Sequence, residues 1–270
     1  MSGESPKLTF WEHLDELRGV LLRIVVFLVG ATVLMFCFKH TLFYVVLAPS
    51  QCDFILYRLL ARAAQSLDIQ SFSIDNFSVV LINTELTGQF MSHLRVALYA
   101  SLIFVIPFAL WQIFRFIAPA LYQSERKPVT FVFVFGQLLF LIGVLLNYFL
   151  IFPLSFRFLA LYQVDTSVDN MIQLSSYIDT FSTLSLMMGI LFEIPLVSIM
   201  LARLGIITHK IMSYYRRHAV LAILIVAAII TPTTDIFTLI MVALPIWLLY
   251  ELSIVAVRIV GRRKASVSND

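Results

Sequence analysis

Two glutamates lie beside long apolar runs, at positions where a carboxylate has little part in membrane orientation. Glu16 belongs to the segment His13-Leu14-Asp15-Glu16-Leu17-Arg18, and Glu125 belongs to the connector from Phe116 to Arg126. Lys and Arg in such places orient a membrane protein, whereas Asp and Glu contribute little. A pair of carboxylates can bind guanidinium groups, because the planar fork of Arg matches a carboxylate and the Lys ammonium does not. Two simpler alternatives stay open: Glu16 could favour the start of a helix, and Glu125 could form a weak surface pair with the cation that follows it.

Further polar residues lie within or between apolar runs. Glu193 stands in Phe192-Glu193-Ile194-Pro195, and a charge at the bilayer centre costs about 2.5–3.5 kcal/mol. It must therefore face a partner or a cavity, or remain a protonated residue bonded within the bundle. Pro195 removes one backbone donor and predicts a kink with a polar notch. Asp235 follows Thr231-Pro232-Thr233-Thr234 and is typical of a turn or a helix cap.

The composition places these residues in a membrane protein. Hydrophobic residues make up 60% of the 270 residues and charged residues 13%, against about 25% charged in an average soluble domain. The formal net charge of +3, without a clustered basic face, gives no nucleic-acid signature. Because a span needs about 20 apolar residues, the sequence predicts one all-α polytopic membrane domain over residues 1–270 with six transmembrane helices. The expected spans cover residues 20–38, 94–114, 129–152, 177–204, 218–230 and 236–257, with outer loops at 49–93 and 154–176.

The charge distribution predicts the orientation of these spans. With the N-terminus inside, 14 of the 19 Lys and Arg residues fall on the inner side and 5 on the outer side, in keeping with the positive-inside rule. This count needs the fifth span, although its apolar part of about 13 residues covers only about 20 Å of a bilayer core about 30 Å thick. The sequence therefore predicts that both chain ends, Glu16 and Glu125 face the cytoplasm.

Other parts of the sequence predict no catalytic or metal site. Phosphate-binding loops, His-x-x-x-His pairs and nucleophile elbows are absent from the sequence, so we expect neither an enzyme nor a cofactor. Cys37 in the first span and Cys52 in the first outer loop are expected to be free thiols. That loop also carries apolar residues at helical spacing, which predict an amphipathic helix along the membrane. These residues are Ile55, Leu59, Ala63 and Leu67.

The polar segments together resemble the TatC family, the multispanning receptor subunits of the twin-arginine (Sec-independent) protein translocase. The resemblance covers nearly the whole chain with the right spacing and number of spans. The matching segments are His13-Leu14-Asp15-Glu16-Leu17-Arg18, Phe116-Ile117-Ala118-Pro119-Ala120-Leu121-Tyr122 through Glu125-Arg126, Phe192-Glu193-Ile194-Pro195 and, more weakly, Thr231-Pro232 with Asp235.

This resemblance implies a function that composition and spacing do not show. It implies binding of signal peptides with consecutive arginines, presentation to TatA- or TatB-type single-span subunits, and export of folded proteins by the proton motive force. The implied location is the bacterial cytoplasmic (inner) membrane, where the chain would contact lipids and self-associate in the assembled complex. The implied shape is a concave, glove-like bundle.

The resemblance also implies two groups of site residues. The first would bind the signal peptide: Glu16, Glu125, Leu17, Arg18 and Phe116. The second would contact partner subunits within the membrane: Glu193, Thr231 and Asp235. The chain departs from the family in a longer first outer loop, one extra residue in the turn before Asp235, and apolar residues around Leu239 where some relatives carry glutamine. The last departure weakens the residue-level prediction of the partner site.

Two other classes of function stay open. A proton-coupled small-solute transporter could use Glu193 as a relay, but it predicts further ionisable residues at membrane depth and an internal repeat, and the sequence shows neither clearly. A passive scaffold predicts that charge reversal at Glu16 and Glu125 leaves export intact.

Overall fold

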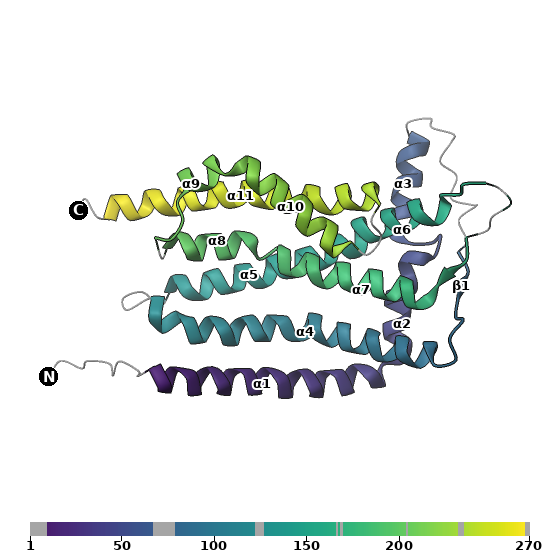
Figure 1. Ribbon diagram of the computed structural model, residues 1–270, viewed down its shortest axis with the longest axis horizontal. Helices are drawn as coiled ribbons and strands as arrows, with labels where there is room; N and C mark the ends of the chain where they lie inside the picture. Colours follow the sequence, from purple (N-terminus) through teal and green to yellow (C-terminus); the bar gives the residue numbers. More distant parts are fainter. Residues whose placement is uncertain are drawn as a thin grey trace.

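The protein is a bundle of long helices, seen here in a computed structural model (Figure 1). The structure describes residues 10–66, 79–121, 127–165, 167, 170–203, 205–231 and 235–267. The expected all-α fold is confirmed, since the strands in these ranges have only two residues each. The elements are α1 (Phe10–Cys37), α2 (Lys39–Leu47), η1 (Ala48–Ser50), α3 (Ile55–Ser66), β1 (Leu81–Ile82), α4 (Gly88–Leu121), α5 (Lys127–Leu146), η2 (Asn147–Ile151), α6 (Phe152–Leu161), β2 (Ile172–Gln173), α7 (Leu174–Leu191), α8 (Ile194–Arg203), α9 (His209–Tyr214), α10 (Arg216–Ile230) and α11 (Ile236–Val267).

Five helical runs among the described residues are long and apolar enough to cross a membrane. They are Leu14–Cys37, Gly88–Ile113, Val134–Leu161, Leu174–Arg203 and Ile236–Gly261. The expected fifth span is α10, which has 15 residues and is about 22 Å long at 1.5 Å per residue. It packs against α11. The described residues therefore form five helical runs long enough to span a bilayer, and α10 is a shorter expected span beside them.

Two long helical runs are interrupted, in different ways. The third continues from α5 through the π-helical turn η2 into α6 and ends at Leu161, where the sequence predicts an outer loop from residue 154. The helix continues past Pro153 because this residue lies in the first turn of α6, and π-type adjustments can satisfy the backbone groups that a proline frees. The fourth breaks between α7 and α8 at Phe192 and Glu193, just before Pro195, as the sequence predicts.

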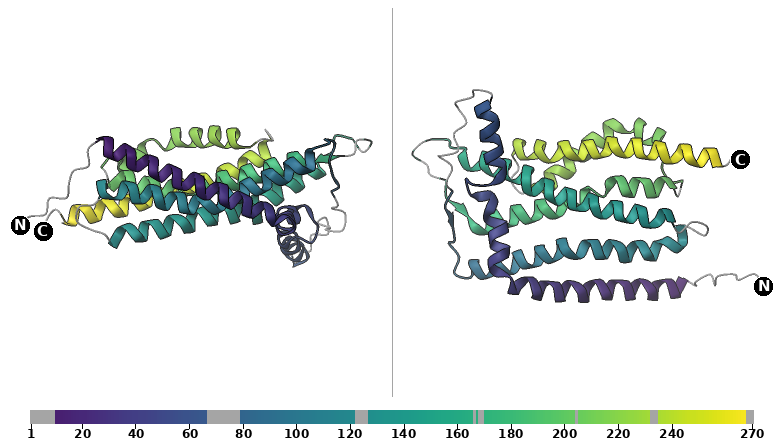
Figure 2. Two further views of the ribbon diagram at one scale, coloured as in Figure 1. Left: turned by 90° about the horizontal axis from the view of Figure 1, so that it is seen from below. Right: turned by 180° about the vertical axis from the view of Figure 1, so that it is seen from behind.

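The helices α2 and α3 lie across one end of the bundle (Figure 1; Figure 2). We call this the cap end, and the opposite end, where α1 begins and α11 ends, the terminal end. Tyr57 of α3 is fully buried, and its hydroxyl lies 3.0 Å from the carbonyl oxygen of Pro49 and 2.9 Å from that of Pro153. Burial raises the pKa of the Tyr57 hydroxyl above its usual value, so the hydroxyl stays protonated and can donate to these two carbonyl oxygens. In addition, β1 pairs in parallel with β2, which joins the segment before α4 to the segment before α7.

Two predictions that concern the first outer loop can be compared with the structure at the cap end. The predicted amphipathic helix is present as α3, and its Ile55 and Leu59 side chains are exposed. Leu67 lies outside the described residues. Cys37 and Cys52 are both free and exposed, which confirms that they are unpaired thiols.

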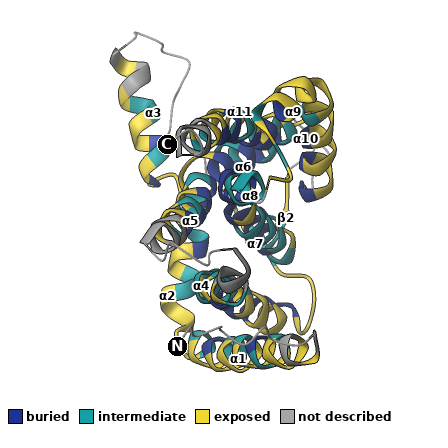
Figure 3. Cartoon of the chain, turned by 90° about the vertical axis from the view of Figure 1, so that its left-hand side faces the viewer, coloured by how far each residue is buried: buried dark blue, intermediate teal, exposed yellow. Residues whose placement is uncertain are grey.

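The buried core draws most of its residues from α6, α7, α10 and α11; buried residues are dark blue in Figure 3. Near the cap end it is aromatic: the ring of Phe152 lies 5.1 Å from that of Tyr177 and 5.0 Å from that of Phe181. The first span is much less buried: 11% of its apolar 18-residue window is buried, against 44% of the corresponding windows in the third and fourth spans. It packs on the rest of the bundle chiefly through α4.

Two glycines let α5 approach α7 closely. A methyl group at Gly143 would lie 2.6 Å from the backbone oxygen of Met188, and one at Gly189 would lie 2.6 Å from a ring atom of α5. Beyond them, Nδ2 of Asn147 donates a hydrogen bond of 2.8 Å to Oγ of Ser185. Because this contact is close and polar, it fixes the register of the two helices.

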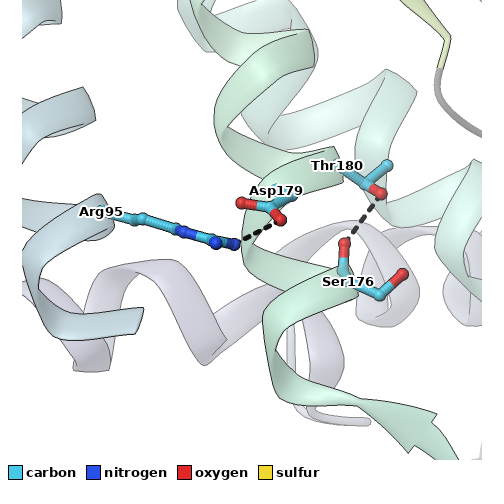
Figure 4. Close-up of polar contacts among 4 residues, drawn as sticks. All are labelled: Arg95, Ser176, Asp179 and Thr180. Carbon is cyan, nitrogen blue, oxygen red and sulfur yellow. Dashed lines mark hydrogen bonds and ion pairs between the residues drawn. The ribbon is translucent and has the colours of Figure 1, made fainter. Parts of the chain in front are cut away.

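An ion pair joins α4 to α7 near the cap end (Figure 4). Nη1 of Arg95 lies 2.6 Å from Oδ2 of Asp179, and the two side chains are 48% and 46% exposed. Both residues lie within runs apolar enough to span a membrane, where an unpaired charge is expensive. Each side chain therefore provides the partner that the other needs at that depth.

Candidate functional site

A small cavity opens between α1 and α4 near the terminal end. Its volume is about 70 Å³, and its lining residues come from two helices: Glu16, Val20, Arg23, Gln112, Arg115 and Phe116. Farther along the same helix pair, the hydroxyl oxygens of Thr32 and Ser101 lie 2.7 Å apart, and the rings of Phe27 and Phe108 lie 4.6 Å apart. These contacts hold α1 against α4 and so position the cavity.

Helical spacing explains why these side chains meet. On α1 the lining residues follow one another at i, i+4 and i+7, and on α4 at i, i+3 and i+4, so each set lies on one face of its helix. The residue at position 18 follows Glu16 by two places, about 200° around the helix. Leu17 and Arg18 do not line the cavity.

The cavity holds charges of both signs. Its described lining carries one carboxylate, Glu16, and two guanidinium groups, Arg23 and Arg115. Nε of Arg23 donates to the backbone oxygen of Gly19 at 3.1 Å. Within the described part of the chain, no ion pair forms at the Glu16 carboxylate, which is exposed. The carboxylate is therefore available to a ligand, but the two arginines oppose a cationic one.

The structure brings together only part of the predicted signal-peptide group. Glu16 and Phe116 line the same cavity, although 100 residues separate them in the sequence. Glu125 lies outside the described residues, so its distance from Glu16 is not defined. Sequence reasoning missed Arg23, Gln112 and Arg115 as neighbours of Glu16. The spacing of seven residues from Glu16 to Arg23 was a usable signal, because it places both on one helix face.

Glu193 is buried, at 6% exposure, at the break between α7 and α8. Neither carboxylate oxygen has a hydrogen-bond partner among the described residues. A methyl group at Gly136 of α5 would lie 3.0 Å from Oε2 of Glu193 and 2.6 Å from Leu196, so the glycine leaves room for the carboxyl group. The carboxyl group is covered by the chain itself in this conformation.

Thr231 and Asp235 flank the segment between α10 and α11. Oγ1 of Thr231 donates to the backbone oxygen of Ala227 at 2.9 Å. Oδ1 of Asp235 accepts a hydrogen bond of 2.7 Å from the backbone nitrogen of Thr238, so Asp235 caps α11. Its Oδ2 and the Thr238 hydroxyl are buried without partners among the described residues. Among all the residues that the structure describes, no three His, Cys, Asp or Glu side chains are placed to hold a metal ion.

Comparisons with known proteins agree over most of the chain. A family model described as Sec-independent protein translocase protein (TatC) matches residues 12–245. A TatC protein of Blattabacterium sp. subsp. Periplaneta americana is 32% identical over 98% of this chain and 100% of its own length. A TatC protein of Deinococcus radiodurans is 34% identical over 92% of this chain and 85% of its own length.

Solved structures give the same result. Two crystal structures of the twin arginine translocase receptor TatC, one of them in DDM, are each 27% identical to this chain. Their TM-scores are 0.70 over 93% of this chain and 0.75 over 92%, and each match covers the whole of the solved chain.

Proposed function

Because this chain belongs to the TatC family of Sec-independent protein translocase proteins, we propose that it is the receptor subunit of a twin-arginine translocase. It binds signal peptides with consecutive arginines and, with TatA- or TatB-type single-span subunits, exports folded proteins across the bacterial cytoplasmic membrane using the proton motive force. The observation that carries this proposal is the cavity that brings Glu16 and Phe116 together at the terminal end.

The charges of the cavity require a second carboxylate. Glu16 alone cannot balance two incoming guanidinium groups beside Arg23 and Arg115. Glu125, in the connector that follows α4, supplies the second carboxylate in this proposal. Each hydrogen bond to a charged group is worth about 1.5–3 kcal/mol, and bidentate geometry favours arginine over lysine. Two carboxylates then select an arginine pair without very tight binding.

The orientation follows from the same proposal. The beginning of α1 and the end of α11 lie at one end of the bundle (Figure 1), and most Lys and Arg residues fall on that side of the spans. The positive-inside rule places this end in the cytoplasm, so the cap end faces outward. The cavity is then open to signal peptides before export.

Partner subunits dock within the membrane along α10 and α11 in this proposal, near Thr231 and Asp235. The exposed apolar face of α10 supports this placement, since Leu221 and Ile229 are 60% and 78% exposed. Contact between a partner and Glu193 requires α8 to move, because the chain covers the carboxyl group. Lipids cover the remaining apolar faces, and copies of the chain associate in the assembled complex.

Binding of a fluorescent signal peptide to the purified protein in lipid nanodiscs tests the proposal. We expect an Arg-Arg peptide to bind at least about tenfold more tightly than its Lys-Lys version. Glu16→Gln and Glu125→Gln should each remove most of that difference. Arg23→Gln should tighten binding of the Arg-Arg peptide about two- to fivefold, because it removes a nearby like charge.

A matched control is Asp53→Asn, which removes one carboxylate at the cap end, where Asp53 pairs with Arg58. This variant should bind both peptides as the native protein does. Equal affinity of the native protein for the Arg-Arg and Lys-Lys peptides would contradict the receptor proposal.

A further inference from the structure

The helix α3 extends sideways from the cap end, beyond the rest of the bundle (Figure 1; Figure 3). Its first turn is fixed to the bundle: Tyr57 is fully buried, and Phe54, just before the helix, stacks on Phe149 of η2 with ring centroids 6.0 Å apart. Farther along, the Leu59 and Arg62 side chains are exposed. An isolated helix of 12 residues is marginal in water, so the exposed part of α3 needs a surface to lie on.

The exposed side of α3 has an apolar edge and a basic edge. Ile55 and Leu59 are 54% and 55% exposed, and they share a face because they are at i, i+4. Arg58 and Arg62 have the same spacing and lie about 60° to one side of that face; both are exposed. Tyr57 follows Ile55 by two positions, about 200° around the helix. The apolar edge therefore points away from the contacts that hold α3 to the bundle.

The position of α3 is that of a membrane interface. It lies across the bundle at the level where α1 ends and α11 begins (Figure 1; Figure 2), and both helices belong to runs that can span a membrane. The surface beside its first turn is apolar and exposed as well. Phe149, which stacks on Phe54, is 42% exposed, and Leu145, four residues earlier in the third span, is 50% exposed. The apolar edge of α3 thus continues the outer surface of a span at the level where that span leaves the hydrocarbon core.

We propose that α3 is an interfacial helix that anchors the cap in the bilayer leaflet at that end. Ile55 and Leu59 insert among the acyl chains, while Arg58 and Arg62 bind lipid phosphate groups. Amphipathic helices with basic residues beside an apolar face lie in the interface in this way, and the planar fork of Arg matches a phosphate. This inference goes beyond the proposed function and does not depend on signal-peptide binding.

A second copy of the chain fits the exposed side of α3 less well. A symmetric contact between two copies places the same patch on both sides, so the arginines of both copies would meet. Asp53 offsets one of the two cations, since its carboxylate lies 3.1 Å from Arg58. Arg62 forms no ion pair with any described residue. Lipid phosphates supply the negative charge that a second copy of this edge lacks.

Fluorescence quenching in lipid nanodiscs tests where the apolar edge lies. A bimane label is attached to Leu59→Cys or to Gln65→Cys, each in a background of Cys37→Ser and Cys52→Ser, because both native cysteines are exposed. The lipids carry bromine on their acyl chains. We expect quenching at position 59 to be at least about threefold stronger than at position 65. Gln65 is the matched control because it lies seven residues after Arg58, on the basic side of the same helix.

Aqueous iodide should quench the two labels in the opposite order. Stronger quenching of position 59 by iodide than by brominated lipid would overturn the proposal. Protection of position 59 from both quenchers would show that protein covers the edge, as a second copy would, and would overturn the proposal too. Selective binding of the Arg-Arg peptide by the same labelled proteins tests the proposed function separately.

Hydrogen exchange of the α3 amides in nanodiscs gives a second test without labels. Leu59→Glu places a charge where the proposal has acyl chains, so it should speed exchange in α3 about tenfold or more. Gln65→Glu adds the same charge on the basic side and should leave the rates within about twofold of the native ones. Equal rates in the two variants would refute the lipid contact of the apolar edge.

Discussion

A single methyl group at Gly143 should force two helices of the core apart. In the native protein the added Cβ would lie 2.6 Å from the backbone oxygen of Met188, and 2.8 Å and 2.9 Å from atoms of Phe192. Ordinary contacts begin at 3.4 Å, so α5 and α7 must separate by about 0.8 Å at this point. Backbone atoms cannot rotate away as a side-chain end can. Overpacking of this kind costs about 1–3 kcal/mol.

The separation should also weaken a hydrogen bond one turn away. Nδ2 of Asn147 donates to Oγ of Ser185 at 2.8 Å, and 0.8 Å of added distance would exceed hydrogen-bond range. Asn147 is fully buried, so its amide would lose a partner that water cannot replace. The loss adds about 1 kcal/mol, which places the expected destabilisation at the upper end of the range.

Thermal unfolding in detergent, followed by circular dichroism, measures this effect. At roughly 2–4 °C per kcal/mol, a loss of about 3 kcal/mol should lower the midpoint of Gly143→Ala by about 6–12 °C. Gly30→Ala is the control, because a methyl group at Gly30 meets no atom within 4 Å and alanine favours a helix. A midpoint for Gly143→Ala equal to that for Gly30→Ala would refute the reasoning.

Two more predictions concern the cap end. Tyr57→Phe removes the hydroxyl that lies 3.0 Å and 2.9 Å from the carbonyl oxygens of Pro49 and Pro153. Loss of these hydrogen bonds should lower the free energy of unfolding by about 1 kcal/mol and speed tryptic cleavage within α3. Unchanged cleavage would show that the hydroxyl does not hold α3 in place. Asp179→Asn leaves Arg95 unpaired within an apolar run. Because the pair is about half exposed, the free energy of unfolding should fall by about 1 kcal/mol. Adding Arg95→Gln should restore the midpoint of thermal unfolding, and two additive losses would show that the pair is not coupled.

Local sequence signals predicted much of the fold. Apolar length was enough for the long helical runs, because a bilayer core sets how many apolar residues a span needs. Pro195 marked the break before α8, and Asp235 marked the cap of α11, since both effects act within a few residues. Local signals did not predict the π-helical turn before Pro153, through which the helix continues.

Contacts between distant parts of the chain could not be predicted from one sequence. Half of the residues that line the cavity at Glu16 come from α4, and Arg95 pairs with Asp179 across 84 positions. No local sequence signal distinguishes Gly143, where a neighbouring helix lies in close contact, from Gly30, where an added methyl group would meet no atom within 4 Å. These contacts form only when the helices pack together, so residue type and spacing in one sequence do not predict them.

The candidate site lies in the less buried part of the bundle. Its two helices belong to spans whose apolar 18-residue windows are 11% and 28% buried, whereas those of the third and fourth spans are 44% buried. The close glycine contacts and the buried Asn147 bond belong to α5 and α7, away from α1. A peptide that binds at the cavity between α1 and α4 therefore lies away from the buried contacts of α5 and α7, which keep their register. The low-stability part of a structure is where binding elements can move, so we expect ligand-induced changes in hydrogen exchange to concentrate in α1 and the terminal half of α4.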